Sequence, residues 1–311
     1  MVDTKPARGT GAQGLMESGD RDTLRRPYRT WRKWWHAAER AVTIGRWPAR
    51  LATQLGASSA VAVERQRIEL DQPLGSAREL RIAFASDFHA GPNTPDGLID
   101  ASIRELKNLK ADLLLLGGDF VSVRPDYLRD LGHRLAQIPA SLGRYAVLGN
   151  HDYWADGPAV SNALTDAGIH MLTNRNVALP APFEHVSLCG LDDYSDGDPD
   201  ADAAFAGARA VRIVLMHGPS TLLHVGERPF AVALCGHTHG GQIALPDGRP
   251  IKVALGPLSR RYNAGRYALD QGRVLLVSRG IGCSTIPLRF NAPPAILECT
   301  VTGGGNSVRT E

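Results

Sequence analysis

Acidic, amide and imidazole side chains follow five apolar segments of the chain. The five segments are expected to be strands, near residues 80–86, 113–116, 146–148, 213–216 and 231–235. The residues after them read Asp87-Phe88-His89, Gly118-Asp119, Gly149-Asn150-His151-Asp152, His217-Gly218 and Gly236-His237-Thr238-His239. Ligands bind at the carboxyl ends of the strands in open α/β sheets. These side chains are therefore expected to meet at one edge of the fold.

The residue types are those of a metal site with mixed nitrogen and oxygen ligands. Imidazole and carboxylate together suit Zn, Mn or Fe. Asp87 and His89 lie two positions apart, as do His237 and His239, so each pair points the same way on an extended segment. Each motif alone is weak, because an isolated Asp-x-His is usually a surface pair. However, five of the ten histidines fall in these motifs, and the combination predicts a centre with two divalent cations.

The order and spacing of the motifs resemble those of the calcineurin-like metallophosphoesterases, over about residues 80–301. This resemblance implies an α/β fold in four layers (αββα), a β-sandwich flanked by helices. It implies that one cation is held by Asp87, His89 and His239, and the other by Asn150, His217 and His237. Asp119 would bridge the two. A phosphoester would be the substrate.

Two further residues follow the expected ligand Asn150. By the same resemblance, His151 is a general acid or a charge donor to the phosphoryl group. Asp152 has two open roles: it fixes the tautomer of His151, or it caps a helix expected over residues 157–168. We assign both residues to catalysis.

A narrower resemblance is carried by residues 236–246, 278–282 and 287–294, which are similar to the membrane-associated bacterial phosphodiesterases. That branch includes enzymes resembling UDP-2,3-diacylglucosamine pyrophosphatases of lipid A synthesis. It implies a phosphodiester or pyrophosphate bond in a lipid-linked or nucleotide-linked substrate. Arg279 and Arg289 are candidates for binding its second phosphate or head group, with a structural ion pair as the alternative. A phosphomonoesterase or phosphoprotein phosphatase is the second functional hypothesis, and a non-catalytic metal-binding scaffold is the third.

Charge and residue composition divide the chain into three parts. Residues 1–56 carry eleven Lys/Arg and five Asp/Glu, whereas the rest carries 24 and 27. The polar residues 1–23 predict disorder, and residues 28–46 predict a helix with clustered Trp on one face, ended by Pro48. Residues 57–302 form the expected catalytic domain, and residues 303–311 a flexible tail.

The basic, Trp-rich helix over residues 28–46 predicts contact with an anionic membrane surface. The alternatives are packing on the catalytic domain or on a partner. Nucleic acid is not expected. No stretch of 18 apolar residues is present, so no membrane-spanning helix is expected, and the apolar run of an export signal does not follow Arg25-Arg26. We expect a cytoplasmic protein, peripheral at the inner face of the membrane.

Periodicity predicts the remaining elements. Further strands are expected near residues 61–70, 170–173, 185–190, 242–245, 273–278 and 295–301, and helices over residues 95–109 and 126–137. The acidic run over residues 192–202 predicts a solvated loop, not a calcium site. The four cysteines form no CxxC pair and are expected to be free and buried.

Overall fold

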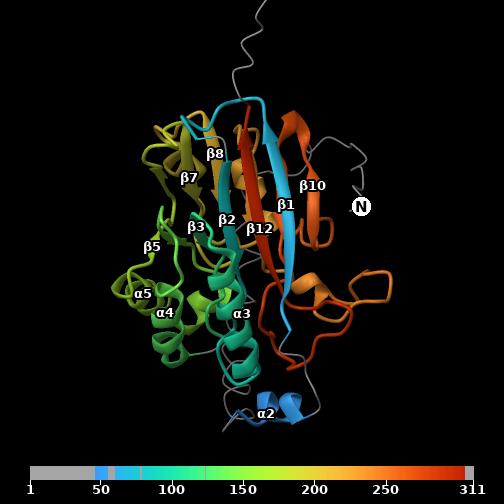
Figure 1. Ribbon diagram of the computed structural model, residues 1–311. Helices are drawn as coiled ribbons and strands as arrows, with labels where there is room; N and C mark the ends of the chain where they lie inside the picture. The colour runs from blue at the N-terminus through green and yellow to red at the C-terminus, as the bar shows by residue number, and fades with distance from the viewer. Residues whose placement is uncertain (1–45, 55–59, 78, 123, 305–311) are drawn as a thin grey trace, which may run out of the picture.

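The computed structural model describes residues 46–54, 60–77, 79–122 and 124–304. Within these ranges, two six-stranded sheets lie face to face and helices cover their outer surfaces (Figure 1). The helix expected over residues 28–46 lies outside the described residues, except for Arg46. The division of the chain at residues 56 and 302 stays a prediction.

The first sheet has the strand order β1-β12-β2-β3-β4-β5. Its strands are β1 (Ala62–Leu70), β2 (Glu79–Ala85), β3 (Leu113–Leu116), β4 (Arg144–Ala146), β5 (His170–Met171) and β12 (Ala295–Gly303). Strands β2 to β5 are parallel to one another, whereas β12 is antiparallel to β2 and parallel to β1. The carboxyl ends of β2, β3 and β4 therefore lie at the same edge.

The second sheet has the order β10-β11-β9-β8-β7-β6. Its strands are β6 (Arg175–Ala178), β7 (Val186–Gly190), β8 (Val211–Leu215), β9 (Val232–Cys235), β10 (Gly265–Ala268) and β11 (Val274–Val277). The central strands β7, β8, β9 and β11 are parallel, and the two edge strands are antiparallel to their neighbours. Parallel central strands again bring their carboxyl ends to one edge.

Alternating side chains of each strand build two different cores. On β2, Leu80, Ile82 and Phe84 point between the sheets, where they pack against residues of β8 and β9. Ala83 and Ala85 point to the other face and pack against helices. This alternation follows from the two-residue period of a strand, and it explains why both faces of β2 are apolar.

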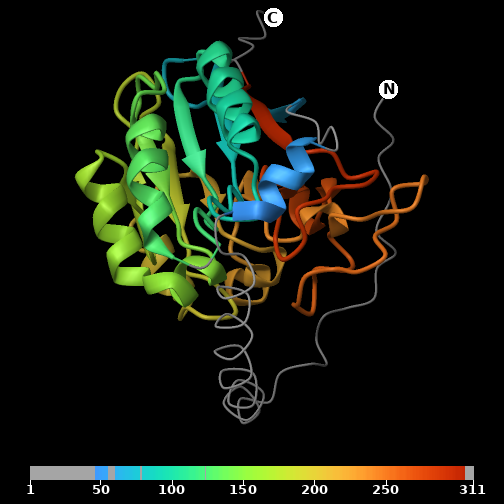
Figure 2. The same ribbon diagram turned by 90° about the horizontal axis from the view of Figure 1, so that it is seen from below.

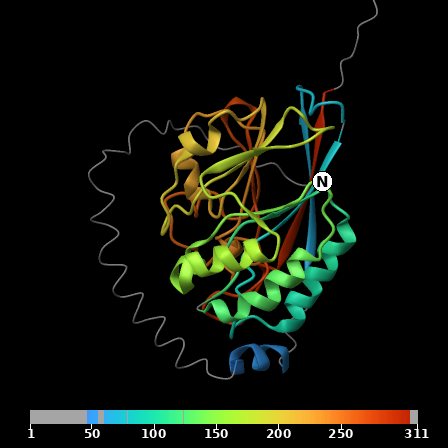
Figure 3. The same ribbon diagram turned by 90° about the vertical axis from the view of Figure 1, so that its left-hand side faces the viewer.

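Helices form the two outer layers. The first sheet is covered by α3 (Asp96–Leu109), α4 (Leu128–Ala136) and α5 (Asn150–Asp166), which Figure 3 shows on one side of the sandwich. The second sheet is covered by α6 (Ala201–Phe205), α7 (Leu222–Val225) and loops. The four-layer αββα fold predicted from the sequence is confirmed. No helix in the described part of the chain is long and apolar enough to cross a membrane.

Short single turns and one N-terminal helix complete the described chain. The 3-10 turns are Pro125–Tyr127, Pro219–Thr221, His239–Gly241 and Asp270–Gly272. Helix α2 (Trp47–Gln54) reaches the body through Arg46, which forms an ion pair of 2.8 Å with Asp96. Pro48 was expected to end a helix but lies in the first turn of α2. Residues there need no N–H, because the first N–H groups of a helix have no partner within it.

Several expectations need correction. Residues 242–245 are not a strand: Ile243 and Ala244 form only isolated bridges, because Gln242 just before them has a left-handed φ of 56° that breaks the extended path. The helix expected from residue 157 begins at Asn150, and a non-helical residue, Asp156, interrupts it. Strands β6 and β10 were not expected. The four cysteines are free and buried, as predicted.

Candidate metal centre

All seven expected ligands lie at one end of the sandwich, where the parallel strands end. The residues after β2, β3 and β4 come from the first sheet, and those after β8 and β9 from the second. In chain order they are Asp87, His89, Asp119, Asn150, His217, His237 and His239. Six are buried, and His237 is partly exposed. The topology therefore brings together the residues that the sequence pattern singled out.

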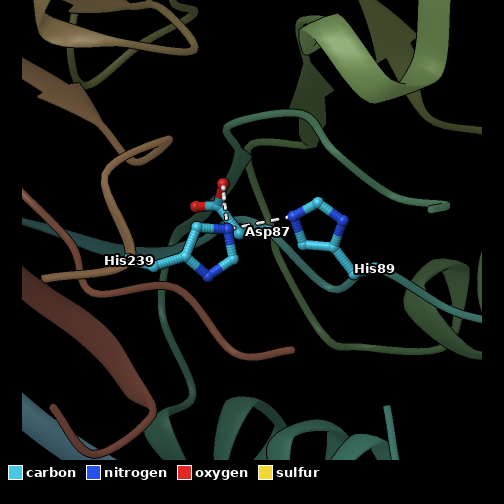
Figure 4. Close-up of side chains that lie close together, drawn as sticks. All are labelled: Asp87, His89 and His239. Carbon is cyan, nitrogen blue, oxygen red and sulfur yellow. Dashed lines mark hydrogen bonds and ion pairs between the residues drawn. The ribbon is translucent and has the colours of Figure 1, made fainter. Parts of the chain in front are cut away.

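The first group consists of Asp87, His89 and His239, shown in Figure 4. The Nε2 atom of His239 lies 3.0 Å from Nε2 of His89 and 3.6 Å from Oδ1 of Asp87. His239 comes from the second sheet and the other two residues from the first. One ligand atom of each residue lies within 4.8 Å of the others, a spacing that suits one cation.

The second group consists of Asp119, His217 and His237, with Asn150 beside them. Nε2 of His217 lies 3.1 Å from both Nδ1 of His237 and Oδ1 of Asn150. Oδ2 of Asp119 lies 3.4 Å from Nε2 of His217 and 3.5 Å from Nε2 of His89. One carboxylate oxygen therefore adjoins both groups, as the bridging role requires.

Backbone carbonyls orient two of the imidazoles. Nδ1–H of His217 donates to the carbonyl oxygen of Gly117 at 2.7 Å, and Nε2–H of His237 donates to that of Leu255 at 2.8 Å. In each ring, the other nitrogen then presents its lone pair to the centre. A hydrogen bond on the far nitrogen is the usual partner of a metal-ligating histidine. These tautomers fit cation binding.

The pKa directions fit the same reading. Burial, with nearby His151, holds the pKa of His89 well below its usual value, and burial with His89 and Arg289 does so for His239. Burial opposes ionisation of Asp119, but His217 and His151 hold its pKa well below the usual range. The neutral imidazoles of His89 and His239 beside an ionised carboxylate suit a borderline divalent cation, whereas, against the effect of burial, Asp119 holds the pKa of His217 well above its usual value, so His217 must lose a proton to bind one.

Five of the seven residues have a backbone conformation that non-glycine residues rarely adopt. The φ angles are 55° at Asp87, 44° at His89, 53° at Asp119, 70° at His237 and 54° at His239. Each left-handed residue costs on the order of 1 kcal/mol and persists only where the surrounding fold holds it. Such strain clusters at functional sites, so the conformation itself marks the centre.

His151 lies against both cation groups. Its Nδ1 is 2.9 Å from the carbonyl oxygen of Ser122, to which it donates, so Nε2 is left for the centre. Its ring centroid lies 4.6 Å from that of His89 and 4.2 Å from that of Trp154. A ligand atom of His151 lies within 4.8 Å of those of His89 and Asp119, close enough to serve a group bound there.

Asp152 holds the backbone around Asp119. Its carboxylate accepts N–H bonds from Asp119 and Phe120 at 2.8 Å, and from Gly149 at 2.9 Å. The bond from Gly149, the residue before α5, satisfies a free N–H at the start of that helix. Burial and the charge of Asp119 raise the pKa of Asp152 to about 8, although the N–H groups of Gly149 and Val121 act to lower it. The His151 ring donates to the Ser122 carbonyl. Asp152 binds backbone N–H groups at the start of α5, which begins seven residues before the predicted helix.

Both candidate arginines have protein partners. Arg289 donates to the carbonyl oxygens of Gly282 and Ala292, and its Nη2 lies 2.9 Å from Nδ1 of His239. A guanidinium only donates, so this contact needs a lone pair on Nδ1 of His239. If His239 binds a cation through Nε2, its proton moves to Nδ1, and the contact with Arg289 must then lengthen. Arg279 pairs with Glu64 and the carbonyl of Pro293. Their role in substrate binding stays a prediction.

The acidic run is only partly the solvated loop that was expected. Asp192 and Asp193 are buried. The hydroxyl of Tyr153 donates to Asp192, and Asp193 accepts N–H bonds from Ser195 at 2.8 Å and Asp196 at 2.7 Å. These carboxylates were not singled out by sequence reasoning, because nothing in the run distinguishes the two that turn inward.

This fold and this centre define a class, the metallophosphoesterases. The family model described as calcineurin-like phosphoesterase matches residues 80–241. The chain belongs to that family, whose members are phosphoester hydrolases.

Three similar proteins illustrate how much of the sequence is shared. Phosphodiesterase YaeI of Escherichia coli is 32% identical over 71% of this chain and 82% of its own length. The metallophosphoesterase YkuE of Bacillus subtilis is 32% identical over 71% and 78%. UDP-2,3-diacylglucosamine pyrophosphatase LpxG of Chlamydia trachomatis is 27% identical over 75% and 87%.

Proposed function

We propose that this protein hydrolyses a phosphodiester or pyrophosphate bond with two divalent cations. The observation that carries the proposal is the position of Asp119, whose Oδ2 lies about equally far from His217, at 3.4 Å, and His89, at 3.5 Å. The residues around it supply nitrogen and oxygen ligands on both sides. Zn, Mn and Fe suit this set.

Bound cations would supply Lewis-acid chemistry, which offsets charge on the phosphoryl oxygens and makes water acidic enough to ionise near neutral pH. Asp87, His89 and His239 would hold one, and Asn150, His217 and His237 the other, with Asp119 between. The contacts described above support this donor set. Proton donation and positioning would be carried out by side chains of the protein.

His151 is the proposed proton donor. The Ser122 carbonyl keeps a proton on Nδ1, so Nε2 faces the centre, and the doubly protonated ring can give its Nε2 proton to the leaving oxygen, which leaves a neutral imidazole. Trp154 packs against the ring and limits its rotation. Asp152 positions the chain: it ties the N–H groups of residues 119–121 to the start of α5, and the N–H of His151 in turn donates to Oδ1 of Asp119 at 2.8 Å. Acid and bridging carboxylate are thereby held at a fixed separation.

A lipid-linked or nucleotide-linked substrate is the second part of the proposal. It is supported by the similarity to LpxG and YaeI, whose names specify a UDP-2,3-diacylglucosamine pyrophosphatase and a phosphodiesterase. A precursor of lipid A is one substrate of this kind. Contact of residues 28–46 with an anionic membrane, at the cytoplasmic face, remains part of it and rests on their composition alone.

The test is a comparison of substrates on protein reconstituted with Mn, Zn or Fe. We expect turnover of bis-p-nitrophenyl phosphate and of UDP-2,3-diacylglucosamine to exceed that of p-nitrophenyl phosphate. The inverse order would favour the phosphomonoesterase alternative.

Asp119→Asn serves as the matched inactive variant. It removes one negative charge shared by both cation groups and is nearly isosteric, so it should lose turnover and the second cation while keeping its fold. Wild-type turnover with two cations bound per chain would contradict the assignment.

A further inference from the structure

Exposed large apolar side chains gather at the end of the molecule that holds the metal centre. Among the described residues, eight such side chains are exposed, and two of them, Trp47 and Leu51, lie on α2. The other six, which we call the apolar rim, are Leu245, Ile251, Leu255, Ile286, Leu288 and Phe290. Their exposed fractions run from 41% to 63%. A grouping of this kind marks an interaction surface, whereas scattered single residues would not.

The apolar rim is built into the fold. Its two loops, residues 242–258 and 284–291, are joined by backbone bonds of 2.9 Å from Ala244 N to Phe290 O and from Phe290 N to Gln242 O. The side chain of Gln242 donates to the carbonyl of Ile286 at 2.8 Å. The apolar side chains are therefore held outward on a bonded scaffold.

The same loops contact the metal ligands directly. The carbonyl of Leu255 accepts from His237 at 2.8 Å, and Arg289 donates to the carbonyl of His239 at 3.3 Å. Figures 1 and 2 show both loops and α2 at the same end of the molecule. A surface that covered the apolar rim would therefore lie beside the reacting centre.

Charge on the longer loop, and on the six residues that follow it, is complementary to an anionic partner. Between residues 242 and 264 the basic side chains are Arg249, Lys252, Arg260 and Arg261, all exposed, and the one acidic residue is Asp247. Asp247 is paired with Arg249 at 2.6 Å. Two copies of this chain joined through the apolar rim would oppose like charges, which disfavours a second copy as its occupant.

We propose that the apolar rim docks on a bilayer that contains anionic lipid. The apolar side chains enter the boundary between headgroups and acyl chains, and the basic residues lie at the level of the lipid phosphates. The metal centre then faces the headgroup layer. What it cleaves there rests on the proposed function, but docking itself requires no turnover.

The test is co-sedimentation of the full-length protein with vesicles of phosphatidylcholine, with and without phosphatidylglycerol. A Leu288→Ser/Phe290→Ser variant should bind both kinds at least about tenfold more weakly, since burial of each side chain is lost. Ile251→Ser provides an independent single change of the same kind. Melting temperature and metal content report whether each variant is folded.

Charge is tested with a matched pair. Lys252→Glu should weaken binding to the phosphatidylglycerol vesicles about tenfold or more. Arg209→Glu makes the same change of charge at an exposed residue just before β8. Because the metal centre lies after β8, this residue is at the opposite end of the strand, and the change should have little effect. Asp119→Asn should sediment like the wild type, which separates docking from the proposed function.

Three results would overturn the proposal. The first is wild-type protein that binds neither kind of vesicle. The second is folded rim variants that bind as well as the wild type. The third is a wild-type dimer by light scattering that Leu288→Ser/Phe290→Ser converts to a monomer, because a second copy would then cover the apolar rim.

Discussion

A single added methyl group at Gly149 should disable the metal centre, although the φ and ψ angles of Gly149 suit alanine. Gly149 has φ −107° and ψ 174°, a conformation open to alanine. A Cβ there would lie 2.3 Å from Oδ1 of Asp119 and 2.6 Å from Cε1 of His217. The backbone N of Asp119 would also lie 2.6 Å from this Cβ, and ordinary contact starts at 3.4 Å. Both ligands must therefore move away from the Cβ by about 1 Å, a displacement that can cost ~10²-fold in rate.

The assay compares turnover, metal content and thermal unfolding of Gly149→Ala with those of a second glycine variant. Gly132→Ala is the matched control. Gly132 lies in α4, and the nearest atom to its new Cβ would belong to Ala167, at an ordinary contact distance of 3.7 Å. It should raise the free energy of unfolding by about 0.4–1 kcal/mol and leave turnover unchanged. Gly149→Ala protein with two cations per chain and wild-type turnover would refute the reasoning.

Three further predictions concern the protons and hydrogen bonds of the centre. His151→Ala should keep both cations by elemental analysis and lose ~10²–10⁴ in kcat, less with good leaving groups; a metal-free variant would make His151 a ligand. Burial acts against protonation of His217, but Asp119 holds its pKa well above the usual value. Cation binding should therefore release a proton, and affinity should rise with pH by up to about tenfold per unit below that pKa, as calorimetry in buffers of different ionisation enthalpy would reveal; pH-independent affinity would contradict this. Asp152→Asn replaces an acceptor of several buried N–H bonds and should lower the free energy of unfolding by about 1–3 kcal/mol in urea titrations; unchanged stability would remove its positioning role.

The sequence allowed the ligands to be predicted because their signal is residue type at a strand end. A short apolar run followed by Asp87 or His217 is visible without coordinates, and parallel strands bring such ends to one edge. The four layers follow from the same alternation of apolar segments, since each sheet needs cover on both faces.

Other parts of the centre carry no such signal. The groups that orient the imidazoles are backbone carbonyls, at Gly117, Ser122 and Leu255, and every residue has a carbonyl. The inward turn of Asp192 depends on Tyr153, a partner 39 positions earlier. The start of α5 was misplaced because the non-helical residue Asp156 divides the helix, and only the part after it was predicted.

Each of the two proposed ligand groups draws its residues from both sheets. His239 meets Asp87 and His89 across the sandwich, as His217 and His237 meet Asp119. A bound cation would therefore join the two sheets, and sliding one sheet over the other would break several coordination bonds at once. Metal binding would therefore serve the stability of the fold as well as catalysis. Removing the metal with a chelator would let the two sheets separate at the end that holds the centre, while the apolar core between the sheets keeps them together elsewhere.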